Sequence, residues 1–294
     1  MPRFGRICRI GAENMRKALN LLKWTATLGS EPQNFLGAKW IPRFLEKVPE
    51  RKKRKWALRF ISFSPHYFLE PDAPKYKGMG SDEYLEAVFA ATAESRVAIY
   101  DDILNQHLDR SMTVIDYGCG PGFLAKAVSP HVAKVYACDI SRGVLACAKK
   151  VNAAENIEYV SILDGELDQI PDTGVDAIYS FAVIQHLTDE VFDTVLRNCR
   201  AKLRPGGLLI LHIQLVDDVW RTEDDWKSDD SISGRVKYRY GLHCFARSEE
   251  KHRDMVAKHS FGDIRIVSLE DLVAEPQAEQ LSQAILTAKL PNGK

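Results

Sequence analysis

The sequence predicts a protein of the α/β class, with a seven-stranded, mostly parallel sheet flanked by helices. The 294 residues are 45% hydrophobic and 27% charged, a composition typical of globular chains. No apolar run approaches the roughly 20 residues that span a bilayer. From residue 113 onward, short β-rich runs alternate with helical stretches. Parallel strands need such crossovers to return to the same edge of a sheet, so the alternation predicts βαβ units.

The first 80 residues differ from the rest of the chain. Residues 1–60 contain 15 Lys and Arg against 4 Asp and Glu, although the whole chain is balanced at 40 of each sign. A loop with two prolines, 71–74, then interrupts the helical pattern. We therefore expect residues 1–80 to form a basic, helical N-terminal extension, and residues 81–294 to form the main domain.

The elements of the main domain follow one another in a regular order. Helices are predicted to begin at Ser81 and near Ser248, each with acidic residues in its first turn. The β-rich runs are Thr113–Tyr117, Lys134–Cys138, Ile157–Ile162, Val175–Phe181, Gly207–Ile213, Ile264–Ser268 and Ala284–Leu290.

A long insertion, about residues 215–247, follows the fifth β-run. It carries Trp220, Trp226, Tyr238 and Tyr240 among many charges. Loops of this length are commonly functional, and aromatic side chains can wall a pocket. The same side chains could instead pack the insertion against the sheet.

A glycine-rich loop is the strongest chemical signal. The run 114–123, VIDYGCGPGF, is a β-rich segment that ends in Gly-x-Gly-x-Gly and enters a helical stretch. Glycines allow a sharp turn with positive φ, and they let a ligand approach the backbone where no Cβ intervenes. A tight turn without a ligand is the alternative interpretation.

An acidic residue at the end of the next β-run supports a ligand at this loop. Asp139 lies 21 residues after Gly118, where a carboxylate can accept hydrogen bonds from the two hydroxyls of a ribose. It could instead cap the helix that begins near Ser141. The Gly-x-Gly-x-Gly spacing and the late position of the loop argue against NAD, which favours Gly-x-Gly-x-x-Gly.

Five motifs in order resemble those of the class I S-adenosylmethionine (SAM)-dependent methyltransferases, in the branch of small-molecule and quinone-biosynthesis enzymes. The resemblance implies a Rossmann-like fold and SAM as the cofactor, with S-adenosylhomocysteine (SAH) as its product. It covers about residues 81–290, and one departure is Gly165, which is often Ala in this family. The motifs are 114–123, 137–141, 163–166, 175–187 and 203–207.

The resemblance also implies roles for individual residues. Asp139, with its neighbour Ile140, would hold the ribose, and Asp164 and Gly165 would border the adenine. Asp116 would orient the loop, or would bind the amino group of the ligand through a water. The residues expected at the glycine loop and along the methionyl end are Gly118, Gly120, Gly122 and Phe181.

His186 is the candidate general base. It follows the fourth β-run, near the expected methyl site, and transfer to a hydroxyl needs a group that takes the proton. It could instead cap or pack the next helix. The acceptor is expected to be a small molecule with a hydroxyl group, such as a quinone-like, glycan-linked or lipid-linked compound.

Several function classes are disfavoured. The chain has Ser180–Val183 where amino-methyltransferases of DNA and RNA usually carry Asn/Asp-Pro-Pro-Tyr/Phe, so no DNA partner is expected. The six cysteines show neither CxxC pairs nor zinc spacing, which indicates a reducing cytoplasm and no metal. The acidic residues of 217–230 fit no calcium loop and are interpreted as a solvated lid.

Residues 47–63 are expected to contact an anionic membrane surface. Basic residues 51–55 directly precede Trp56, Phe60 and Phe63, a combination suited to a lipid interface. The alternative is a basic helix packed beside the acidic main domain for charge balance. Two other functions also stay open: a SAM-binding regulatory protein without turnover, and an RNA methyltransferase that binds RNA through the basic extension.

Overall fold

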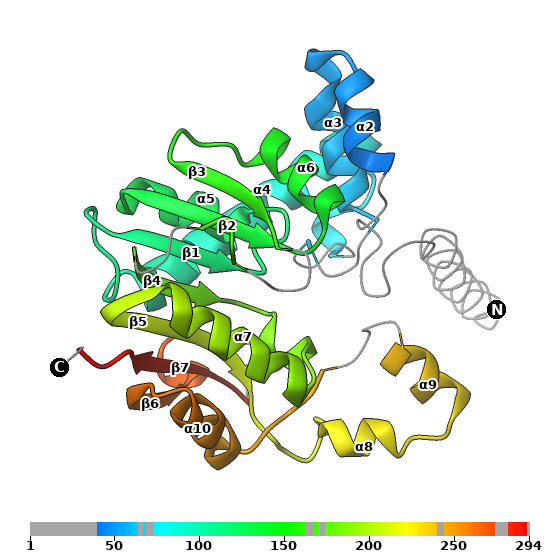
Figure 1. Ribbon diagram of the computed structural model, residues 1–294. Coiled ribbons are helices and arrows are strands. Elements are labelled where there is room, and N and C mark those ends of the chain that lie inside the picture. Colours follow the sequence, from blue (N-terminus) through cyan, green and yellow to red (C-terminus); the bar gives the residue numbers. More distant parts are fainter. Residues whose placement is uncertain are drawn as a thin grey trace.

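The computed structural model of the chain describes residues 40–63, 67–68, 73–162, 167–170, 174–239, 244–273 and 282–292. It confirms the predicted α/β fold with a seven-stranded sheet (Figure 1). The strands are β1 (Thr113–Tyr117), β2 (Lys134–Asp139), β3 (Ile157–Ser161), β4 (Val175–Ser180), β5 (Leu203–Gln214), β6 (Gly262–Ser268) and β7 (Gln283–Lys289).

The strand order is β3-β2-β1-β4-β5-β7-β6. Strands β3, β2, β1, β4 and β5 are parallel, and β7 runs antiparallel to both β5 and β6. In the register of β1 with β2, Tyr117 pairs with Cys138. The loops that leave these two strands therefore start side by side at the carboxyl edge of the sheet, where ligands of open α/β sheets bind.

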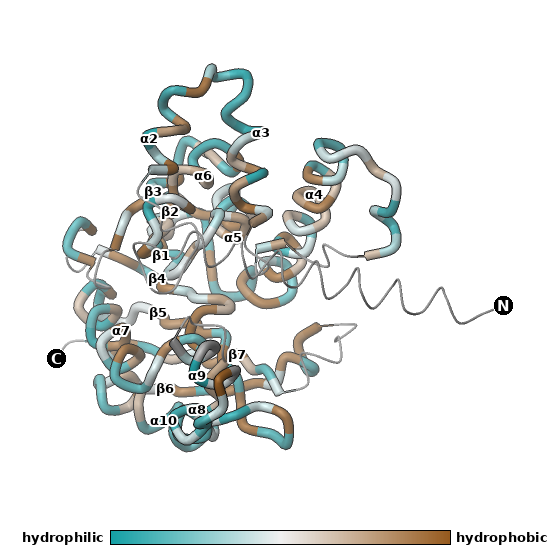
Figure 2. Tube along the Cα trace, turned by 90° about the vertical axis from the view of Figure 1, so that its right-hand side faces the viewer, coloured by the Kyte–Doolittle hydropathy of each residue, from teal (hydrophilic) through white to brown (hydrophobic). Residues whose placement is uncertain are grey.

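Each face of the sheet is buried by its own set of helices. Val114 and Val135 belong to the hydrophobic core that contains α4 (Ser81–Ile99), α5 (Phe123–Val128) and α6 (Arg142–Val151). Ile115 and Tyr136 belong to the opposite core, with α7 (Asp189–Lys202) and α10 (Glu249–Lys258). This alternation follows the two-residue period of a strand. Figure 2 shows hydrophilic residues along the outer helix α10.

The helix starts are close to those predicted. Ser248 is the N-cap of α10, where its side chain accepts a hydrogen bond from the N–H of Lys251. Ser81 is instead the first helical residue of α4, because Gly80 is the extended N-cap and its carbonyl already accepts the N–H of Tyr84.

Two helices of the N-terminal extension pack on the main domain. They are α2 (Trp40–Lys47) and α3 (Glu50–Ile61), and both contact α6. Arg54 of α3 forms an ion pair with Glu86 of α4 at 2.9 Å, and Arg59 forms one with Asp82 at 3.2 Å. The structure describes the predicted extension, residues 1–80, only from residue 40 onward.

The aromatic residues of α3 also make contacts within the chain. Phe60 is 4% exposed, and its ring centroid lies 5.4 Å from that of Trp40 and 5.5 Å from that of Phe44. Phe63 is 40% exposed. This packing agrees with the charge-balancing alternative, and membrane contact through residues 47–63 stays a prediction. Across the described residues, every helix is too short or too polar to cross a membrane.

The insertion contains two short helices, α8 (Glu223–Lys227) and α9 (Ile232–Arg239). They lie apart from the strands, beyond α7 (Figure 1). Leu215 forms a parallel bridge with Arg247, so the two ends of the insertion meet beside β5. The bounds of the insertion, about residues 215 and 247, stay a prediction.

We expect the substitution Phe60→Ala to lower the free energy of unfolding by about 3 kcal/mol, because it removes a buried ring from the cluster that joins α2 to α3. Urea denaturation measures this loss. Phe63→Ala, at a 40% exposed ring two residues beyond the end of α3, is the matched control and should change stability by only about 0.5 kcal/mol. Equal losses in the two variants would show that the cluster does not anchor the extension.

Candidate functional site

The glycine loop leaves β1 as a sharp turn. The N–H groups of Gly118 and Cys119 both donate to the carbonyl of Cys138, each at 2.8 Å. Gly118 has φ +77°, and a Cβ there would lie 2.4 Å from Cγ2 of Val183. A side chain at position 118 is therefore disfavoured both by the positive φ and by the contact that it would make with Val183.

Asp139 joins this loop to the next helix. Its Oδ2 accepts the N–H of Gly120 at 2.9 Å, and its Oδ1 accepts the N–H of Ser141 at 2.8 Å. Ser141 in turn is the N-cap of α6. The cap of α6 is therefore Ser141 and not Asp139, whose carboxylate instead orients the turn into α6. The two oxygens of that carboxylate offer about four acceptor sites in all.

Asp116 lies behind the loop, buried at 2% exposure. It accepts a backbone hydrogen bond from Ala125, but its Oδ2 has no hydrogen-bond partner among the described residues. Burial and the nearby charge of Asp139 raise its pKa to about 8, although Ala125 and Arg96 oppose the shift. The site therefore contains a carboxyl group that a positively charged ligand group would favour in its ionised form.

Phe181 follows β4 and stacks on His212 of β5, with ring centroids 5.7 Å apart and planes 11° from parallel. The N–H of Ala182 donates to Nδ1 of His212 at 3.3 Å, so Nε2 carries the proton and donates to Oε1 of Gln283 at 3.0 Å. Burial lowers the pKa of His212 to about 4, which keeps the ring neutral. His212 thus supports the Phe181 turn.

His186 ends the short 3-10 helix Ile184–His186 that follows β4. Its Nδ1 lies 3.9 Å from Sγ of Cys244, a residue at the far end of the insertion. The structure therefore places the candidate base where the turn after β4 meets the insertion.

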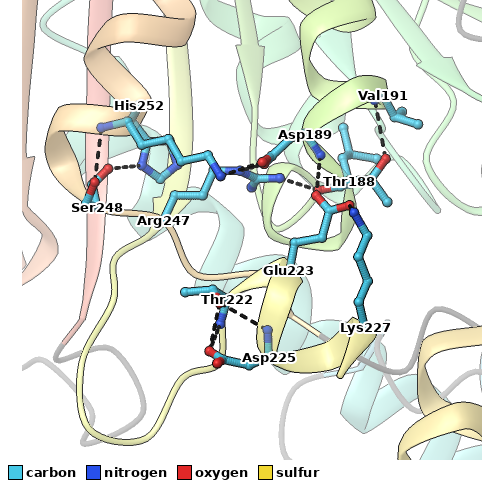
Figure 3. Close-up of polar contacts among 12 residues, drawn as sticks. Thr188, Asp189, Val191, Thr222, Glu223, Asp225, Lys227, Arg247, Ser248 and His252 are labelled. Atoms are coloured by element: carbon cyan, nitrogen blue, oxygen red, sulfur yellow. Dashed lines mark hydrogen bonds and ion pairs between the residues drawn. The ribbon is translucent and has the colours of Figure 1, made fainter. Parts of the chain in front are cut away.

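A buried arginine fixes that turn. Arg247 is 2% exposed, and its guanidinium donates to the carbonyls of Ile184 and Leu187 on either side of His186. It also donates to Oδ1 of Asp189 at 2.7 Å (Figure 3). Such a set of partners is what a buried guanidinium requires. Sequence reasoning missed Arg247, because its partners lie about 60 residues away.

Helix α8 docks on the same region. Oε2 of Glu223 accepts the N–H of Asp189 at 2.7 Å, and its Oε1 pairs with Lys227 at 2.7 Å (Figure 3). Thr222 and Asp225 form a capping box that starts α8. The insertion is thus joined by hydrogen bonds to the N-terminus of α7, next to the candidate base.

The structure describes some, but not all, of the remaining predicted site residues. Gly122 has φ +78° and is the N-cap of α5, and Ile140 is 40% exposed beside Asp139. Gly120 has φ +52° and lies under the ring of Tyr67. Asp164 and Gly165 lie outside the described residues. The predicted site residues that the structure describes lie at one edge of the sheet.

The described cysteines are free thiols, and burial raises the pKa of each. They suit packing better than nucleophilic chemistry. Within the described ranges, no group of three or more His, Cys, Asp and Glu could hold a metal ion.

Comparisons with known proteins found similarity to methyltransferases. Residues 114–207 match the family described as a methyltransferase domain. N-demethylindolmycin N-methyltransferase of Streptomyces griseus is 27% identical over 147 residues, which is 49% of this chain and 56% of that protein. Ubiquinone biosynthesis O-methyltransferase of Coxiella burnetii is 33% identical over 104 residues, which is 33% of this chain and 41% of that protein.

The fold is also similar to that of a chain in the complex between the Haloferax volcanii Trm112 methyltransferase activator and a methyltransferase. The TM-score is 0.50 at 14% identity, covering 69% of this chain and 98% of that one. Residues 114–207 are therefore similar in sequence to a methyltransferase domain, and the fold around them is similar to that of a chain from a methyltransferase complex. It spans about half the length of the curated relatives it matches.

We predict that the protein loses stability in acid through its buried histidines. Burial lowers the pKa of His252 to about 4, so between pH 6.5 and 4 the unfolded chain binds a proton that the folded chain does not. Stability therefore falls as the pH falls, by up to about 1.4 kcal/mol per pH unit for this group.

Urea unfolding at several pH values between 4.5 and 7 tests this prediction. His252→Leu should flatten the decline, while the contribution of His212 remains, because burial lowers its pKa to about 4 as well. Parallel pH curves for the variant and the parent would contradict the assignment.

Proposed function

We propose that this protein transfers a methyl group from SAM to a hydroxyl of a small-molecule acceptor. The observation that carries the proposal is the Asp139 carboxylate, which ends β2 and holds the N–H of Gly120 in the glycine loop. A carboxylate in that place accepts hydrogen bonds from ribose hydroxyls. Two relatives named for small molecules, N-demethylindolmycin and ubiquinone, support a small-molecule acceptor, and the second is named as an O-methyltransferase, which supports the hydroxyl.

The residues present fit the cofactor on two further observations. Gly118 and Gly120 both have positive φ and present backbone without a Cβ. Oδ2 of Asp116 is a buried acceptor without a hydrogen-bond partner among the described residues, and an ammonium group could satisfy it directly or through a water. Phe181, held by His212, would border the methionyl end.

SAM supplies an electrophilic methyl group on a sulfonium sulfur. The protein must hold the nucleophilic oxygen in line with that methyl group and keep water out, because an in-line displacement depends on positioning. Asp139 would fix the ribose, and His186 would take the proton that the acceptor hydroxyl loses. The two side chains reach the same edge of the sheet from the ends of β2 and β4.

The ribose assignment predicts that Asp139→Asn binds SAH about 1.5 to 3 kcal/mol more weakly, the range for hydrogen bonds to a charged group. Asparagine keeps an acceptor oxygen for one of the two backbone N–H groups and is close to aspartate in size, so it disturbs the loop less than alanine would. Isothermal titration calorimetry measures the affinity, and circular dichroism checks the fold.

Asp193→Asn is the control, because Asp193 pairs with Lys258 and His259 on the α7–α10 face. Its SAH affinity should equal that of the parent. Unchanged SAH affinity in a folded Asp139→Asn variant would remove the ribose assignment. Formation of SAH from SAM that depends on added cell extract would separate an enzyme from a SAM-binding protein without turnover.

The role of His186 has its own test. If it takes the proton of the acceptor, His186→Ala should lower turnover about 10²- to 10⁴-fold while SAH affinity stays the same. A loss below tenfold would return His186 to a packing role beside Cys244. Urea unfolding of the variant shows whether a loss of activity reflects a loss of structure.

A further inference from the structure

We propose that a hollow beside the N-terminal helices binds a soluble phosphate monoester with a short apolar chain. At the β3 end of the sheet, α2 lies beside α6 (Figure 1). The hollow between these elements has a volume of about 370 Å³, within the usual range for small-molecule sites. Its walls include Leu45 of α2, Lys53 of α3, Arg142 and Ala146 of α6, and Tyr159 and Ser161 of β3.

The inner walls of the hollow are apolar. Leu45 is 2% exposed and Leu145 is 4% exposed, and both belong to the same hydrophobic core. Tyr159 forms another side, and its hydroxyl donates to the carbonyl of Asn152 at 2.9 Å. Because these side chains are buried within the protein, the ligand must enter as a single molecule rather than stay in a bilayer.

The rim of the hollow is basic. Four cationic side chains contribute to it, Lys53, Arg142, Lys149 and Lys150. Glu46 is the carboxylate of the rim, and Glu50 pairs with Lys53 at 2.7 Å and with Lys150 at 3.5 Å. The other two cations form no ion pair or hydrogen bond with any residue that the structure describes. The surplus of two positive charges matches a phosphate monoester, which carries about −1.5 to −2 at pH 7.

A buried hydroxyl marks the place of the phosphate. Oγ of Ser161 is buried and has no hydrogen-bond partner among the described residues. Ser161 pairs in register with Asp139, and Arg142 follows Asp139 by three residues as the first residue of α6. Both polar side chains therefore lie near the start of this helix. The donors of the guanidinium and the hydroxyl can bind the oxygens of one phosphate, and the positive end of the helix dipole favours its charge.

The apolar chain of the ligand would lie along α6. Leu145 and Ala146 follow Arg142 by three and four residues, which places them on the same helix face, one turn further on. Leu45 lines the hollow from α2. A chain attached to a phosphate at Arg142 would therefore contact apolar side chains of both helices.

The hollow borders the proposed cofactor edge without including it. Asp139 is next to Ser161 in the sheet, but its carboxylate accepts the N–H groups of Gly120 and Ser141. The walls of the hollow come instead from the N-terminal helices, from α6 and from β3 at the edge of the sheet. The phosphate ester and SAH should therefore bind at the same time, so this inference goes beyond the proposed methyl transfer.

The test uses n-hexyl phosphate as the probe and full-length protein, with and without saturating SAH. We expect a dissociation constant on the order of 1 mM or below, consistent with a ligand of this size. Inorganic phosphate lacks the chain and 1-hexanol lacks the charge, so each should bind about tenfold more weakly or worse. Isothermal titration calorimetry measures all three affinities, and SAH should leave that of hexyl phosphate unchanged.

Two variants test the phosphate site and the apolar wall separately. Arg142→Gln should weaken binding of hexyl phosphate about tenfold or more, the loss expected for a hydrogen bond to a charged group. Ala146→Leu should weaken it to a similar degree, because the larger side chain fills the hollow. Arg200→Gln is the matched control, because Arg200 is an exposed residue near the end of α7, on the opposite face of the sheet. Circular dichroism shows whether each variant is folded.

The proposal would be overturned by absence of hexyl phosphate binding to the parent at 10 mM, on the order of ten times the expected constant. Equal affinity for inorganic phosphate, or equal binding by the Arg142 and Arg200 variants, would also overturn it. Competition by SAH would assign the hollow to the cofactor site, and binding to phosphatidate vesicles alone would assign the basic rim to membrane contact. SAH binding by the same protein tests the proposed function independently.

Discussion

The candidate site depends on one carboxylate shared by two backbone segments. Asp139 accepts the N–H of Gly120 from the loop after β1 and the N–H of Ser141 at the start of α6. The parallel register of β1 with β2 places these segments side by side, and the carboxylate then fixes their separation. Because both contacts involve a charged acceptor, they are stronger than hydrogen bonds between neutral groups. The proposed cofactor edge is therefore organised by contacts within the protein itself.

The insertion depends in a similar way on a buried guanidinium. Arg247 binds the carbonyls of Ile184 and Leu187 and the carboxylate of Asp189, so the chain that returns from the insertion is fixed to the turn after β4. Removing one partner of such a buried set leaves unsatisfied polar groups, which costs free energy. Helix α8 adds the contact of Glu223 with the first turn of α7. The insertion is thereby joined to the backbone on both sides of His186.

The sequence predicted the local features well, because neighbouring residues determine them. The alternation of β-rich and helical segments located all seven strands, and the cap at Ser248 followed from residues beside it. What could not be predicted depends on contacts between distant segments. The antiparallel place of β7 between β5 and β6 is one case. The support of Phe181 by His212, and the approach of Cys244 to His186, are others, since their partners lie 30 to 58 residues apart.

The charges at the cofactor edge also fit a positively charged ligand. Asp116 and Asp139 stand at the ends of adjacent strands, and two nearby carboxylates oppose each other's ionisation. Burial is the larger cause, and with the charge of Asp139 it raises the pKa of Asp116 to about 8, while Asp139 keeps its backbone donors. A sulfonium or ammonium group near this pair would stabilise the ionised form of Asp116.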